Sequence, residues 1–151
     1  MGGITVAING YSLASAQALQ NLLFRASAAT FPTVFYVGLS TAAATWSDPN
    51  PFVNGEPGPT TGYARVAVTR NTTNWTAADA DTAKVTNAVE ITFPESTQSW
   101  GTITAFAIFG AATGITDFSL GGNLTNPVTI GTSTIARFNI GDLQVSSVNA
   151  P

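Results

Sequence analysis

The sequence predicts a mainly β protein, a β-sandwich or jelly-roll of about seven to nine short strands with one N-terminal α-helix. Three observations carry this prediction. Apolar and polar residues alternate over much of the chain, and a single segment shows helical spacing. Turn signals such as Gly121-Gly122 and Gly141-Asp142 separate the expected strands. A closed barrel is the alternative architecture.

The expected helix covers residues 12–26. Ser12 is a suitable N-cap residue, and the strong helix formers alanine, leucine and glutamine dominate the segment. Its apolar residues recur at spacings of three and four and form one stripe: Leu13, Ala16, Leu19, Leu22, Leu23 and Ala26. Because such a stripe more often packs on the protein's own core than on a partner, we expect this helix to dock on the sheet.

The expected strands fall into two kinds. Residues 34–39 and 103–109 are apolar on both faces and belong in the middle of a sheet. Residues 64–69 and 89–93 alternate as half-buried strands do, and we expect Pro94 to end the second. The remaining candidates are residues 118–124 with a glycine-marked bulge, 128–130, 136–140 and 143–148.

The domain organisation is expected to be simple, because 151 residues are typical of a single domain. Residues 1–11 are an N-terminal arm or first strand, and residues 12–151 form one β-sandwich domain. The arm is either an ordinary strand or a segment that pairs with the sheet edge of a neighbouring subunit. A proline- and glycine-rich loop covers residues 43–62, and a loop of this length is either functional or ordered against a neighbour.

The absence of histidine and cysteine excludes whole classes of chemistry. Without histidine there is no Ser-His-Asp or Cys-His arrangement and no histidine-ligated zinc, and without cysteine there is no disulfide and no thiolate metal site. Serine and threonine are abundant, but a nucleophile needs a base, and Lys84 is the only lysine. We therefore expect no enzymatic activity, no catalytic residue, no small-molecule substrate and no cofactor.

Charge is scarce in this chain. Charged residues make up 9% of it, against about 25% in typical soluble domains, and the net charge is −3. Disorder does not explain this, since 44% of the residues are hydrophobic and 10% are aromatic. Charge depletion is typical of interface cores, so the composition favours an exterior that is covered in an assembly. The alternative is a monomer with a neutral, threonine-rich β surface.

The same composition argues against two classes of partner. The five basic residues do not cluster, so we expect no nucleic-acid binding. No apolar run approaches the roughly 20 residues of a membrane span, and the N-terminus lacks the pattern of a signal peptide. We therefore expect no membrane insertion and no export signal.

Candidate site residues are apolar rather than catalytic. Asp79 and Asp81 lie two apart without the further ligands of a calcium loop, so we expect a solvated turn and no metal site. Trp46 and Trp75 lie in loops, where an exposed ring stacks on a sugar or anchors an interface, whereas Trp100 is expected to close one end of the sandwich. The candidate interface residues lie in the arm and the long loop: Ile4, Val6, Ile8, Trp46, Phe52 and Val53.

Five short motifs occur in a fixed order along the chain: YVGLSTA at residues 36–42, GYARVAVT at 62–69, ITFP at 91–94, WGTITAFAIF at 100–109 and GDL at 141–143. Together they resemble a family of small tailed-bacteriophage virion proteins, which includes tail-fibre-like proteins and head decoration (cement) proteins. The resemblance runs from the N-terminal helix to the C-terminal strands and covers most of the chain.

The resemblance implies a structural virion protein without catalytic residues. The first hypothesis is a capsid decoration protein, made in the host cytoplasm, that sits on the outer surface of the phage head. Its expected partners are copies of itself and the major capsid protein, with threefold symmetry as an analogy to other decoration proteins. The alternative is a tail-fibre or receptor-binding module that recognises a glycan on the host surface.

Overall fold

The computed structural model describes residues 10–11, 13–25, 31–43, 52, 55–81, 83–114 and 118–146. Over these residues the chain forms nine strands, the α-helix α1 (Leu13–Arg25) and a short 3-10 helix (Pro59–Thr61). The strands are β1 (Gly10–Tyr11), β2 (Val34–Ser40), β3 (Val66–Thr69), β4 (Lys84–Thr86), β5 (Ile91–Glu95), β6 (Gly101–Phe109), β7 (Ser119–Ile130), β8 (Ile135–Phe138) and β9 (Gln144–Ser146). The prediction of a mainly β chain with one N-terminal helix is confirmed.

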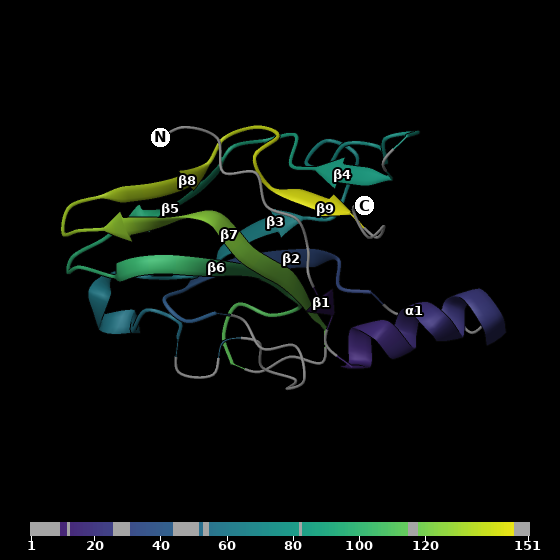
Figure 1. Cartoon of the computed structure of the whole chain (residues 1–151), viewed down its shortest axis with the longest axis horizontal. Coiled ribbons are helices and arrows are strands. Elements are labelled where there is room, and N and C mark those ends of the chain that lie inside the picture. The colour runs from purple at the N-terminus through teal and green to yellow at the C-terminus, as the bar shows by residue number, and fades with distance from the viewer. Residues whose placement is uncertain are drawn as a thin grey trace.

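The strands form two layers. The first layer is a five-stranded antiparallel sheet in the order β1-β7-β6-β2-β3. Two small antiparallel sheets, β4-β9 and β5-β8, form the second layer above it (Figure 1). The described strands therefore form a sandwich, and they do not close into the alternative barrel.

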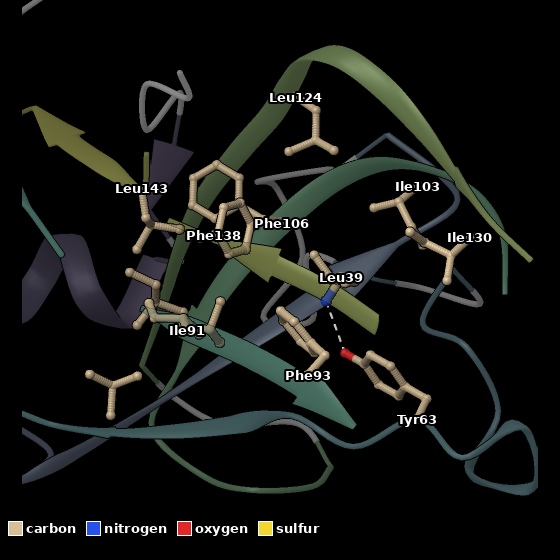
Figure 2. Close-up of a cluster of buried hydrophobic side chains, with 14 of the residues drawn as sticks. Leu39, Tyr63, Ile91, Phe93, Ile103, Phe106, Leu124, Ile130, Phe138 and Leu143 are labelled. Atoms are coloured by element: carbon tan, nitrogen blue, oxygen red, sulfur yellow. Dashed lines mark hydrogen bonds between the residues drawn. The ribbon is translucent and has the colours of Figure 1, made fainter. Parts of the chain in front are cut away.

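Side chains from both layers meet in one apolar core (Figure 2). The large sheet contributes Leu39, Ile103 and Phe106, and the second layer contributes Phe93 and Phe138. The Phe138 ring packs edge-on against Phe93 and Phe106, with centroid distances of 6.3 and 6.2 Å. Each such buried ring contributes about 1.5–3 kcal/mol relative to leaving it exposed. These contacts hold the two layers together.

A second cluster covers the other face of the large sheet and consists of Phe52, Ala105, Ala107 and Phe109. Strand β6 supplies residues to both clusters, so it is buried on both faces. The sheet order also places β6 in the middle of the five strands. Both observations confirm the prediction made from its uninterrupted apolar run.

Strand β7 differs from its prediction. The sequence suggests two strands, at residues 118–124 and 128–130, with a turn signal at Gly121-Gly122, whereas the structure has one continuous strand. The turn prediction is wrong because the glycine permits a close approach instead. A Cβ at Gly121 would collide with the Phe106 carbonyl oxygen of the adjacent strand β6. The glycines do not mark the expected bulge either, because Gly121 and Gly122 pair in regular register with β6; the register shift lies further along, where the pairing passes from Asn123 to Val128.

Two smaller expectations are also corrected. Pro94 does not end its strand, since β5 continues to Glu95. The pairing of β5 with β8 shifts register between Thr92 and Glu95, so the missing N–H of Pro94 falls at an irregular point where proline is tolerated. Strand β4 was not expected. Its three residues have little pattern of their own and are held by pairing with β9.

Candidate interaction surfaces

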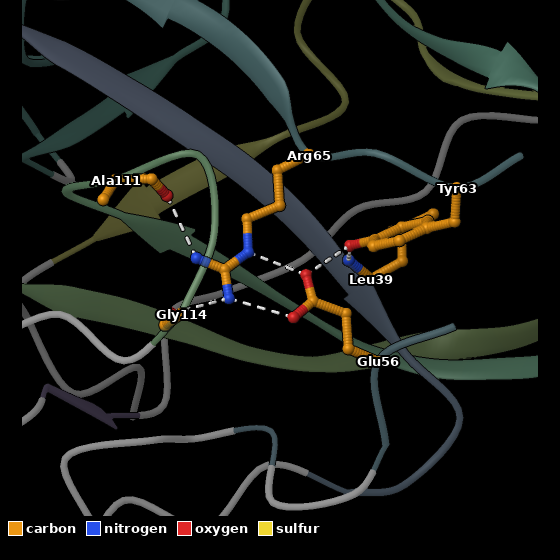
Figure 3. A network of polar contacts seen from close by, with 6 residues as sticks. All are labelled: Leu39, Glu56, Tyr63, Arg65, Ala111 and Gly114. Carbon is orange, nitrogen blue, oxygen red and sulfur yellow. Dashed lines mark hydrogen bonds and ion pairs between the residues drawn. The ribbon is translucent and has the colours of Figure 1, made fainter. Parts of the chain in front are cut away.

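A nearly buried ion pair between Glu56 and Arg65 joins the long loop to the start of β3 (Figure 3). The guanidinium meets the carboxylate through two bonds: Nε donates to Oε1 at 2.7 Å and Nη2 donates to Oε2 at 2.9 Å. The Arg65 side chain is 4% exposed and that of Glu56 is 25% exposed. A bidentate pair of this kind combines charge assistance with a fixed geometry.

The remaining contacts of Arg65 reach the loop between β6 and β7. Its Nη1 donates to the Ala111 carbonyl oxygen at 3.0 Å, and its Nη2 donates to the Gly114 carbonyl oxygen at 3.1 Å. The guanidinium also stacks on Phe109, with Cζ 3.6 Å from the ring centroid. A single side chain therefore ties two loops to the end of β6.

Tyr63 extends this network into the core. Its hydroxyl donates to Glu56 Oε1 at 2.8 Å and accepts the Leu39 N–H of β2 at 2.9 Å. Burial, reinforced by the nearby Glu56 carboxylate, raises the pKa of Tyr63 above its ordinary value. The phenol therefore remains a donor to Glu56 throughout the neutral range.

Gly38 leaves the space that this network occupies. A Cβ at Gly38 would lie 2.9 Å from Phe109 Cε2, 3.0 Å from the Tyr63 hydroxyl and 3.2 Å from Glu56 Oε1. Only glycine allows backbone and side chains to approach this closely. We call Glu56, Tyr63 and Arg65, with Gly38 beneath them, the Arg65 clamp. Its polar groups are engaged with one another, which is the arrangement of a structural tie.

Phe52 is the one predicted interface residue that lies in the described part of the chain. Its side chain is 3% exposed and packs edge-on against Phe109, with ring centroids 5.3 Å apart. Nearby, the Thr41 N–H donates to the Gly55 carbonyl oxygen at 2.8 Å. In this chain Phe52 therefore anchors the long loop to the domain. The other predicted interface residues lie outside the described residues: Ile4, Val6, Ile8, Trp46 and Val53.

The sequence analysis missed the clamp. The alternation over residues 64–69 places Arg65 on the polar face of its strand, where a charge normally meets water. The signal that was available is the scarcity of charge, because the chain has only five basic and eight acidic residues. In such a chain, each charged residue beside an apolar segment is a candidate for a specific ion pair or hydrogen bond within the fold.

Helix α1 behaves differently from the clamp. Its start is fixed to β7 through buried Ser15, whose Oγ accepts the Ser119 N–H at 3.0 Å and donates to the Ser119 carbonyl oxygen at 3.1 Å. Beyond this point the helix extends away from the strands (Figure 1).

The prediction that the apolar stripe of α1 docks on the sheet is therefore wrong. Leu19 is 37% exposed, Leu22 44%, Leu23 67% and Phe24 83%. The second layer covers one face of the large sheet, and a smaller cluster around Phe52 lies on the other face; neither cluster includes a residue of α1. Leu19, Leu22, Leu23 and Phe24 form what we call the α1 surface.

A groove of about 720 Å³ opens between the large sheet and β4-β9. Its apolar wall contains Phe35, Trp75, Val85, Ile108, Leu120 and Val145, and its polar edge contains Arg70, Asn71, Thr72 and Thr76. The Trp75 ring is 9% exposed and packs edge-on against Phe35, with centroids 6.0 Å apart. Trp75 therefore does not present an open face for stacking on a sugar.

The other two features expected from the sequence agree with the structure. Trp100 is buried in the core and its Nε1 donates to the Thr61 carbonyl oxygen at 3.0 Å, which confirms that it closes the sandwich. The pair Asp79 and Asp81 forms an exposed turn in which the Asp81 N–H donates to Asp79 Oδ1 at 3.0 Å. Within the described ranges no group of three or more acidic side chains gathers around a potential metal position.

The described residues also contain no helix with the length and hydropathy needed to cross a bilayer. The helix that is present, α1, is short and is fixed to β7 at its start.

Comparison with known proteins identifies the chain. A family model described as podophage GP4 fiber I protein gp80 matches residues 10–146, which is most of the sequence. No curated protein matches the chain. The matched region runs from β1 to the end of β9, so it contains the Arg65 clamp, α1 and both layers of the sandwich. The resemblance to tailed-phage virion proteins is confirmed: the chain belongs to the podophage GP4 fiber I protein gp80 family and is a structural protein of a phage virion.

Proposed function

We propose that this chain is a non-enzymatic component of a tail fibre, made in the host cytoplasm and built into the virion at the tail. The observation that carries this proposal is the match of a fibre-protein family model to residues 10–146. The geometry agrees with a mechanical role. In the Arg65 clamp the polar groups bind one another and hold the loops in place. The α1 surface exposes apolar side chains that a partner can bury.

The absence of an enzymatic role is part of the proposal. The sequence has no histidine, and its perturbed titrating group, Tyr63, is buried and hydrogen-bonded to Glu56 and Leu39 inside the fold. A general base or nucleophile needs access to a substrate, which this tyrosine lacks. The expected partners are therefore other copies of the chain and neighbouring virion proteins.

Capsid decoration is the second candidate function. The observation that favours it is the low content of charged residues, 9%, which suits a protein whose exterior is covered by a lattice. In that case the partners are copies of the chain and the major capsid protein, and the location is the outer surface of the head.

A host glycan is the ligand to test if the fibre role holds. The groove beside β4-β9 has polar residues on its edge, including Arg70 and Asn71, which are suited to sugar hydroxyls. Because Trp75 is packed edge-on in the wall, recognition there would rest on these polar groups and on the apolar wall. Binding of the wild type to a glycan array that is lost in Arg70→Ala supports glycan recognition by this groove. If the wild type binds no glycan on the array, this role is contradicted.

The two candidate functions differ in copy number. Quantitative mass spectrometry of purified particles measures the number of copies of this chain against the major shell protein. A few to a few tens of copies per particle support the fibre proposal. A number in the hundreds overturns it in favour of decoration, and absence from the particle removes both.

A further inference from the structure

We propose that the groove beside β4-β9 recognises an acidic, N-acetylated oligosaccharide. A carboxylate of the glycan binds at the rim, as we call Arg70, Asn71 and Thr72, and an acetamido group packs into the apolar wall. This inference rests on the glycan recognition considered above and names the chemical class of the ligand. The rim, the wall, a buried donor in the wall and a second hollow beside the groove carry it.

The rim presents hydrogen-bond donors that the rest of the described chain leaves unused. Arg70 is exposed, and its guanidinium forms no ion pair with any described residue. Asn71 Oδ1 accepts the N–H groups of Thr73 and Asn74 at 3.1 and 2.9 Å, so the amide nitrogen of Asn71 is the part that remains for a ligand. The Thr72 hydroxyl lies between these two residues along the chain and is exposed. A guanidinium beside an amide donor and a hydroxyl favours an anionic acceptor such as a carboxylate.

The wall is mostly aliphatic. Val85, Leu120 and Val145 pack against the main core and remain partly exposed in the groove. A sugar hydroxyl pressed against such side chains loses its hydrogen bonds to water without a replacement. Trp75 is packed edge-on and offers no open face to the CH groups of a sugar ring. The part of the ligand that enters here is therefore an apolar substituent, and the methyl group of an acetamido group is one.

Among the six side chains of the wall, Trp75 carries the one polar atom, Nε1. This atom is buried and has no hydrogen-bond partner within the described part of the chain. A buried donor without an acceptor costs free energy, and a ligand acceptor is one explanation for it. Because the N–H is enclosed, an acceptor reaches it only by entering between wall side chains, which suits a small acetamido carbonyl better than a whole sugar ring. The methyl group of a deoxy sugar has no such acceptor.

A second hollow of about 400 Å³ lies beside the groove and shares Thr76 and Ala77 with it. Its other lining residues are polar: Asp79, Lys84 and Thr86. The end of an acyl chain would lie against polar groups there, whereas a further sugar of an oligosaccharide meets hydroxyl, carboxylate and ammonium groups. The second hollow therefore favours an oligosaccharide over a lipid.

The test is a glycan array probed with the full chain, on which each acidic, N-acetylated oligosaccharide is printed beside two altered forms. One form carries a hydroxyl in place of each acetamido group, and the other has its carboxylates reduced to alcohols. We expect binding to at least one parent oligosaccharide, and an affinity lower by about tenfold or more for each altered form when that glycan is titrated. Since both alterations are made in the ligand, the folding of the protein does not enter the comparison.

Two variants assign the two contacts. Arg70→Gln should bind the parent glycan about tenfold more weakly and the carboxyl-reduced form as the wild type does, because the lost interaction is with the carboxylate. Trp75→Phe removes the indole N–H and should weaken the parent glycan about fivefold and the hydroxyl form not at all. Arg137→Gln is the matched control, since it removes a positive charge from a half-exposed side chain outside the groove and should bind like the wild type.

Each contrary outcome has its own meaning. Binding that survives in either altered form, or that is confined to neutral glycans without acetamido groups, overturns this inference and leaves glycan recognition standing. Equal losses in Arg70→Gln and Arg137→Gln overturn the choice of groove. Binding of dodecanoate without binding of any glycan would show that the groove holds an acyl chain, and an array without any binding contradicts this inference and the glycan role together. Copy number in the particle tests the fibre proposal separately.

Discussion

The Arg65 clamp and helix α1 both lie at the edge of the sandwich, but they differ in how far the chain buries their side chains. At the clamp, Arg65 is 4% exposed because it binds Glu56, two loop carbonyls and the face of Phe109 within one chain. On α1, Phe24 is 83% exposed, with its neighbours Leu22 and Leu23 also open.

This contrast separates groups that stabilise the folded chain from groups that do not. Groups that the chain satisfies internally contribute to its free energy of unfolding. Apolar groups that it leaves exposed contribute little to that free energy, because folding does not remove them from water. Changes in the clamp should therefore lower the free energy of unfolding, whereas polar substitutions on the α1 surface should leave it nearly unchanged. The following predictions test the clamp side in order of decreasing effect.

The largest effect is expected for Arg65→Ala. Removing the guanidinium leaves the Glu56 carboxylate with the Tyr63 hydroxyl but without its positive partner, and it removes the Arg65 donors from the Ala111 and Gly114 carbonyls. Breaking a buried pair from one side costs about 3–5 kcal/mol, and we expect about 3 kcal/mol because Glu56 is a quarter exposed. Urea unfolding followed by tryptophan fluorescence measures this loss.

Arg137→Ala is the control for that prediction. Arg137 pairs with Glu90 at 3.6 Å, and the two side chains are 50% and 45% exposed. An open pair of this kind contributes about 0–1 kcal/mol, so the variant should unfold almost like the wild type. Equal losses in Arg65→Ala and Arg137→Ala would mean that the clamp is no stronger than a surface pair.

The second effect concerns the space beneath the clamp. Gly38→Ala places a methyl group 2.9 Å from the Phe109 ring and 3.0 Å from the Tyr63 hydroxyl. Overpacking of this kind costs about 1–3 kcal/mol, and thermal unfolding should show a lower midpoint. Gly58→Ala is the matched control, since its nearest neighbour would be 3.8 Å away and its φ of −67° suits alanine. A drop of the same size in both variants contradicts the steric account.

The smallest effect is expected for Tyr63→Phe and depends on pH. At neutral pH the variant loses about 1–2 kcal/mol, because the Leu39 N–H is left unpaired in the core. The pKa of Tyr63, raised by burial, makes a second, pH-dependent contribution to the free energy of unfolding. In the unfolded chain the phenol loses its proton near pH 10, whereas the folded chain retains it. This contribution is complete below about pH 10 and is lost as the pH rises.

The measurement is urea unfolding of wild type and Tyr63→Phe at pH 8 and at pH 11. The wild type should lose up to about 1.4 kcal/mol more per pH unit above pH 10 than the variant does. All other residues are the same in both proteins, so their contributions cancel in the difference. Parallel pH profiles would show that Tyr63 titrates in the folded protein as it does in the unfolded chain.

The sandwich was predictable from local pattern, and the clamp was not. Alternation correctly places Ile91 and Phe93 in the core with Thr92 outside, and the continuous apolar run correctly places β6 at the centre. Such patterns report burial along one strand. Glu56 and Arg65 come from different segments, so their pairing depends on how a loop folds back, which periodicity does not encode.

The failure at α1 has a different cause. The spacing of Leu19, Leu22 and Leu23 indicates an apolar helix face, but it does not indicate whether the sheet covers that face. The same limit applies to Gly121, where the sequence cannot distinguish a turn glycine from one that admits a neighbouring backbone. In both cases the deciding information lies outside the segment itself, where a local pattern does not report it.

The most direct test of this account is hydrogen–deuterium exchange on the full chain, compared between the wild type and Arg65→Ala. The account predicts that the Leu39 amide, which donates to Tyr63, and its neighbours in the clamp exchange slowly in the wild type and faster in the variant, whereas the amides of α1 exchange at the same rate in both. Equal exchange around the clamp in the two proteins would contradict it, because the clamp would then contribute nothing to holding the loops in place.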